Sequence, residues 1–133
     1  MKAASLSLVA VLVFLVACQS APPPLTPTDS AEVYFQRAQA ASDQSQYEES
    51  LSIYQQFLTN HPEATHEESF SARYEIALLL SKKGLTAEAM NGYQSILDDF
   101  EVLDKSKGAP GWVKVLSQKK LQELKDLVPK KAE

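Results

Sequence analysis

The segment YQQFL, residues 54–58, returns 39 residues later as YQSIL, residues 93–97. The same offset relates Ala38 to Ala77 and Ser50 to Ala89. Each copy contains two stretches in which apolar residues recur at spacings of three and four, and no stretch alternates at period two for long enough to predict a strand. The repeat therefore predicts an all-α chain in which amphipathic helix pairs stack, because each pair needs a neighbour to bury its apolar face.

Five helices are expected between residues 29 and 127. Three helix starts are predicted from capping-box patterns, in which a polar residue is followed three positions later by glutamate: Asp29 with Glu32, Ser45 with Glu48, and Thr65 with Glu68.

The predicted helix ends divide the chain into repeat units. Asn60-His61-Pro62 is expected to end the second helix and Gly84 the third. The fourth helix is expected over residues 87–100, and the fifth runs from Pro110 to about Leu127. The predicted fold is a short α-solenoid of two helix pairs, 29–60 and 65–100, with a C-terminal capping helix.

The repeat unit resembles the tetratricopeptide repeat, in which aromatic and small residues alternate at set places and a proline closes the unit. The first unit supplies Tyr34, Ala38, Tyr47, Ser50, Tyr54 and Pro62, and the second supplies Ala77, Ala89, Tyr93 and the turn GLTAEA. The second unit departs from the pattern at Arg73, Thr86 and Glu101. Its 39-residue period exceeds the usual ~34, which predicts an insertion near HPEATHEE, residues 61–68.

The resemblance implies a concave groove lined by the first helix of each pair, where a peptide or a partner helix binds. The family's groove-facing places fall on seven residues: Phe35, Gln39, Ser42, Tyr74, Leu78, Ser81 and Lys82. Phe35, Tyr74 and Leu78 are equally compatible with core positions at helical spacing.

Two units are few for a solenoid, since about three are usually required. A further 39 residues leads from Arg73 to Trp112, the aromatic place of a third unit. Either the helix that contains Trp112 closes the stack, which we favour, or a partner does.

The chain's only cysteine, Cys18, follows an apolar run in the segment LVACQS, residues 15–20. Residues 1–17 have a signal peptide's basic start and short apolar core, and the run is too short for an ordinary membrane-spanning helix. Leu15 to Cys18 resemble the bacterial lipobox, which implies cleavage before Cys18 and lipidation of its thiol. Gln19, in place of aspartate, favours the outer membrane under the family's sorting rule.

Residues 18–28 are expected to form a proline-rich linker, and residues 128–133 a disordered basic tail. The twelve residues after Cys18 contain four prolines and extend to ~35 Å at ~3.1 Å per residue. Residues 18–100 contain 4 Lys and Arg and 12 Asp and Glu, whereas residues 101–133 contain 8 lysines. The acidic body argues against a nucleic-acid partner, because phosphate binding needs concentrated positive charge.

One segment offers metal ligands, namely His61, Glu63, His66, Glu67 and Glu68. The two histidines are five residues apart across a proline, so they do not share a helix face, and a solvated loop between repeats is the favoured interpretation. There is no glycine-rich phosphate loop and no recognisable nucleophile pattern. We therefore expect no catalytic residues, no metal, no cofactor and no enzyme activity.

The function expected from these features is that of a lipid-anchored adaptor of the cell envelope that binds a protein partner. Its architecture resembles that of tetratricopeptide lipoproteins that assist outer-membrane β-barrel assembly, pilus secretin assembly and Tol-associated wall synthesis. A structural spacer without a groove ligand, and a metal-binding or enzymatic lipoprotein, are the alternatives.

Overall fold

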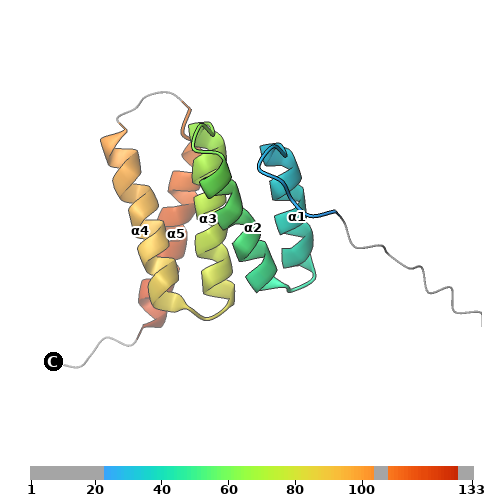
Figure 1. Cartoon of the computed structure of the whole chain (residues 1–133). Helices are drawn as coiled ribbons and strands as arrows, with labels where there is room; N and C mark the ends of the chain where they lie inside the picture. Colours follow the sequence, from blue (N-terminus) through green and yellow to red (C-terminus); the bar gives the residue numbers. More distant parts are fainter. Residues whose placement is uncertain (1–22, 104–107, 129–133) are drawn as a thin grey trace, which may run out of the picture.

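The computed structural model describes residues 23–103 and 108–128. Within these residues the chain forms five helices and no strand, as predicted. The helices are α1 (Ala31–Asp43), α2 (Tyr47–Asn60), α3 (His66–Lys82), α4 (Thr86–Val102) and α5 (Gly111–Leu127). Figure 1 shows them side by side, with α1 and α2 at one end and α4 and α5 at the other.

Helix α3 is the centre of the fold because it contributes to two apolar cores. Ala72 and Leu79 pack with residues of α1 and α2, among them Tyr34 and Phe57. The opposite side of α3 packs with α4 and α5 in a core built around Tyr93. The fold is therefore a short all-α helical-repeat solenoid, in which α5 closes the second pair.

The 39-residue period contains one additional helical turn. The starts of α2 and α4, Tyr47 and Thr86, are 39 residues apart, as are the ends of α1 and α3. The starts of α1 and α3, Ala31 and His66, are only 35 residues apart. The insertion predicted near residues 61–68 thus appears as four additional residues at the beginning of α3.

Only one of the three predicted capping boxes is present. The Thr65 hydroxyl accepts from the Glu68 N–H, and the Glu68 carboxylate accepts from the Thr65 N–H. The prediction at Asp29 is wrong: Ser30 is the N-cap residue of α1, and the Asp29 carboxylate instead accepts from the Thr26 N–H at 2.6 Å.

The predicted capping box at Ser45 is also wrong. Gln46 is the N-cap residue of α2, and Ser45 lies in the left-handed region with φ 60°. Its counterpart one repeat later is Gly84, with φ 78°. In both units the turn ends the first helix in a Schellman motif, in which the N–H of Gln46 or Leu85 bonds to the carbonyl oxygen five residues earlier.

The end of the linker that the structure describes is docked on the first helix pair rather than extended. Leu25 packs against the core between α1 and α2. The Tyr34 hydroxyl donates to the Thr26 carbonyl at 3.0 Å and accepts from Asn60 Nδ2 at 2.8 Å. The partly buried Leu25 and the Tyr34 hydroxyl thus hold this segment, which shortens the free tether expected from the prolines.

Candidate binding groove

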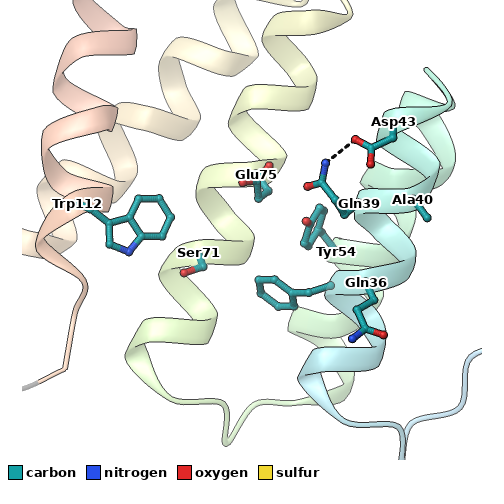
Figure 2. A pocket seen from close by; sticks show the side chains of 9 residues that line it. Gln36, Gln39, Ala40, Asp43, Tyr54, Ser71, Glu75 and Trp112 are labelled. Carbon is teal, nitrogen blue, oxygen red and sulfur yellow. Dashed lines mark hydrogen bonds between the residues drawn. The ribbon is translucent and has the colours of Figure 1, made fainter.

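A groove of about 590 Å³ is formed by side chains of the first helix of each unit, α1 and α3, together with α5 and one residue of α2. Figure 2 shows Trp112 of α5 on one side, Gln39 of α1 on the other, and Ser71 and Glu75 of α3 between them. The lining residues are Phe35, Gln36, Gln39, Ala40, Asp43, Tyr54, Ser71, Glu75 and Trp112.

A second hollow of about 460 Å³ adjoins the first at Phe35 and Ser71, which line both. It lies between the beginnings of α1 and α3. Its other lining residues are Ala31, Glu32, Thr65, Glu67 and Glu68. The two hollows together follow the face that α1 and α3 share.

Aromatic rings form the apolar part of the groove. Phe35 is half-buried and meets the Tyr54 ring edge to face, with the ring centroids 5.2 Å apart. Trp112 meets Tyr74 in the same manner at 5.6 Å, yet 46% of Trp112 remains exposed. Phe35 of α1 and Trp112 of α5 both line the groove, so the apolar surface extends across it from one end of the stack to the other.

Glu75 is the charged group at the middle of the groove. Burial raises the pKa of this carboxyl, and the positive charge of Lys82 lowers it in part. Within the described residues Glu75 forms no hydrogen bond or ion pair. Burial also raises the pKa of Tyr54, and the negative charges of Glu75 and Asp43 raise it further. Tyr54 therefore lies near both Glu75 and Asp43, and these three groups form one acidic region of the groove.

The seven predicted groove residues separate into three groups in the structure. Phe35 and Gln39 line the groove, and the Gln39 amide donates to Asp43 at 2.8 Å. Tyr74 is only 5% exposed and lies in the core between Tyr93 and Trp112. Leu78 is half-buried and packs against that same core.

The remaining three residues lie where α1 and α3 end. Lys82 Nζ donates to the Ser42 hydroxyl at 3.3 Å and lies 5.5 Å from the centre of the Tyr47 ring. The Ser81 carbonyl accepts from the Gly84 N–H. The hydrogen bond between Lys82 and Ser42 thus connects the ends of α1 and α3, whereas Ser81 belongs to the turn after α3. None of the three residues lines either hollow.

Sequence reasoning missed most of the polar lining of the groove. Ser71 and Glu75 are spaced four apart on α3 and so occupy one face of that helix. The signal was available in the repeat, because Glu75 occupies the place of Gln36, which also lines the groove. The repeat pattern predicts only that Trp112 closes the stack, whereas its exposed part also forms one wall of the groove.

Several of the potential metal ligands in residues 61–68 make other contacts. The His61 ring lies against Tyr34 and Phe57, and its Nδ1 is 3.2 Å from the Glu63 carboxylate. Glu68 serves the capping box of α3. Across residues 23–103 and 108–128, no three His, Cys, Asp or Glu side chains are grouped so that they could hold a metal ion.

The predicted signal peptide, the lipidated Cys18, Gln19 and the basic tail from residue 129 lie outside the described residues. None of the helices in the described part of the chain is long and apolar enough to cross a membrane.

The fold and the groove define a helical-repeat protein with a concave face on α1, α3 and α5. Residues 32–64, which contain nearly all of the first helix pair, match the tetratricopeptide repeat family. This match supports a tetratricopeptide-repeat protein, a class whose repeats typically mediate protein–protein interaction. No curated protein and no solved structure matches the chain.

Proposed function

We propose that this protein is an adaptor that binds another protein through the groove between α1, α3 and α5. The observation that carries the proposal is that groove residues come from both helix pairs and from α5, so that the stacking of the repeats itself creates the groove. A spacer would need no such face. The half-exposed Trp112 and the half-buried Phe35 provide the aromatic contact area that is enriched in protein interfaces.

Photo-crosslinking in cells tests this proposal. A photoreactive amino acid replaces Gln39, which lines the groove, and in a second strain replaces Gln55, an exposed residue of α2 that lines neither hollow. The proposal predicts an adduct with one defined protein from position 39 and none with that protein from position 55. Equal adducts from both positions, or none from position 39, would exclude the groove as the binding face.

We further propose that the adaptor is anchored in the bacterial outer membrane through lipid on Cys18 and acts in assembly of the cell envelope. The order of the basic start, the apolar run, Ala17 and Cys18 supports this proposal, and Gln19 supports the choice of membrane. Two or more acyl chains would give a stable anchor, since one alone is marginal.

Metabolic labelling with radioactive palmitate tests the anchor. The wild-type chain is expected to take up label and to separate with outer-membrane vesicles, whereas Cys18→Ser takes up none. Label that persists in Cys18→Ser, or a wild-type chain recovered free of membrane, would contradict the anchor but would leave the adaptor proposal standing.

A further inference from the structure

The chemical character of the groove points to one kind of partner. Glu75 is a half-buried carboxylate that forms no hydrogen bond or ion pair within the described residues. Lys82 acts on Glu75 through its charge, but its ammonium group donates to Ser42 and lies against the Tyr47 ring rather than pairing with the carboxylate. A carboxylate removed from water without a partner is unfavourable, so a cation that enters the groove gains an interaction that the free protein leaves unmade.

The other charged groups on this face have the same sign. In the part of the chain that the structure describes, no lysine, arginine or histidine lines either hollow. Five carboxylates line the two hollows, namely Glu32, Asp43, Glu67, Glu68 and Glu75. The whole face therefore attracts positive charge and disfavours an acidic ligand.

Aromatic rings flank this acidic region. Tyr54 lies on the α1 side of Glu75 and Trp112 on the α5 side (Figure 2), and Phe35 of α1 packs edge to face against Tyr54. An aromatic face attracts a nearby cation and also accommodates the apolar stem of a lysine or arginine. The groove thus offers a charge contact and apolar contacts to a single side chain.

We propose that the groove recognises a segment of another protein that carries a lysine or arginine next to an apolar residue. The cationic group meets Glu75, and the apolar residue lies against Phe35 and Trp112. This inference rests on the proposed adaptor function and specifies the chemistry of its partner. A second copy of the chain is disfavoured as the occupant, because pairing of two identical faces would bring their carboxylates together.

The experiment starts from peptides of unbiased sequence. Random 12-residue peptides displayed on phage are selected on the full chain in detergent micelles, and in parallel on Glu75→Gln. The wild-type selection is expected to enrich lysine or arginine beside an apolar residue, and the Glu75→Gln selection is expected to lose that enrichment. Glu49→Gln on α2 removes the same charge outside both hollows and provides the matched control.

Trp112 then reports the affinity, because it is the chain's only tryptophan and lies in the groove. Its emission is followed while the most enriched peptide, or a version with its basic residue replaced by glutamine, is added. Glu75→Gln is expected to weaken binding of the basic peptide about tenfold and to leave the glutamine version unaffected. Added salt should weaken binding of the basic peptide by wild type more than by Glu75→Gln.

Gln39→Arg separates this inference from the function on which it rests, because it fills the groove while the Glu75 side chain itself is retained. If Gln39→Arg abolishes peptide binding while Glu75→Gln leaves both enrichment and affinity unchanged, the cation proposal is overturned and the groove function stands. If no peptide is enriched, or Gln39→Arg has no effect, both are overturned.

Two other occupants have distinct signatures in the same assay. If peptides bind only after residues 129–133 are deleted, the chain's own Lys130 and Lys131 occupy the groove and the proposal of a separate partner fails. If light scattering shows a dimer that Glu75→Gln dissociates, a second copy is the occupant, and the proposal fails in that case also.

Discussion

At the scale of single residues, the turns after α1 and after α3 have different amino acids at the same repeat position. Ser45 and Gly84 both have positive φ, which glycine adopts readily and serine does not. We expect Ser45→Gly to raise the free energy of unfolding by about 0.5–1 kcal/mol and Gly84→Ala to lower it by about 1–2 kcal/mol. Urea denaturation measures both, and a loss of stability in Ser45→Gly would contradict the left-handed turn.

Gly92 lies at a close approach of α4 to α3. A Cβ at this position would lie 3.0 Å from the Ala77 Cβ, whereas a Cβ at Gly111 would meet nothing within 4 Å. We expect Gly92→Ala to lose up to about 1 kcal/mol of stability, because overpacking outweighs the gain in helix propensity. Gly111→Ala should gain about 0.5 kcal/mol in the same thermal denaturation series. A clear gain from Gly92→Ala would show that the two helices separate easily.

The unpaired charge of Glu75 makes stability depend on pH in a defined direction. Since burial raises the pKa of Glu75 above its unfolded value, the folded chain holds the proton more tightly, and ionisation costs stability as the pH rises through the folded pKa. Glu75→Gln should therefore be more stable than wild type at pH 7.5, by about 0.5–1 kcal/mol after allowance for solvent screening. The difference should disappear below about pH 4. An equal difference at both pH values would refute a titrating Glu75.

At the scale of helices, α3 explains a departure from the repeat pattern that the sequence left open. Arg73 occupies the place of Tyr34, which is fully buried in the first unit. Arg73 instead forms an ion pair with Asp99 of α4 at 2.7 Å and donates to the Ser95 hydroxyl at 3.0 Å. The adjacent Tyr74 fills the core in its stead. In the second unit the aromatic core residue is thus shifted by one position, from 73 to 74, and Arg73 forms polar contacts with α4.

Helix α5 closes the stack, and its two sides should differ sharply in their effect on stability. Leu121 is 5% exposed in the second core, whereas Val115 is 62% exposed. Leu121→Ala should cost about 2–4 kcal/mol, because it leaves a cavity, and Val115→Ala should cost less than about 0.5 kcal/mol. Circular dichroism during urea denaturation measures both. Equal effects would mean that α5 does not complete the core.

At the scale of the whole molecule, the fold could be predicted from the sequence because the same helix-pair pattern occurs twice. The matching segments YQQFL and YQSIL, with Ala38 and Ala77 in register, predict helix pairs without any knowledge of distant contacts. The capping-box rule failed at Asp29 and Ser45 because it is local. The Asp29 carboxylate accepts a hydrogen bond from the Thr26 N–H in the preceding turn and so does not cap α1. Ser45 lies in the turn between α1 and α2, whose geometry requires positive φ at this position.

The candidate groove was less predictable than the fold. Which side of a helix faces a groove depends on the angle at which the units stack, and no short sequence pattern encodes that angle. Of the residues at the family's groove-facing positions, Phe35 and Gln39 therefore line the groove, whereas Tyr74 lies in the core. Trp112 reaches the groove only because α5 packs against α3 and α4.

The central claim is that the face formed by α1, α3 and α5 binds a partner, and amide hydrogen exchange tests it most directly. The full chain in micelles is compared with and without the phage-selected peptide. We expect slower exchange within residues 35–43 and 71–75 and near Trp112, with α2 and α4 unchanged on their outer sides. Gln39→Arg should abolish this protection and Gln55→Arg should preserve it. Protection confined to α2 and α4, or protection that persists in Gln39→Arg, would contradict the account.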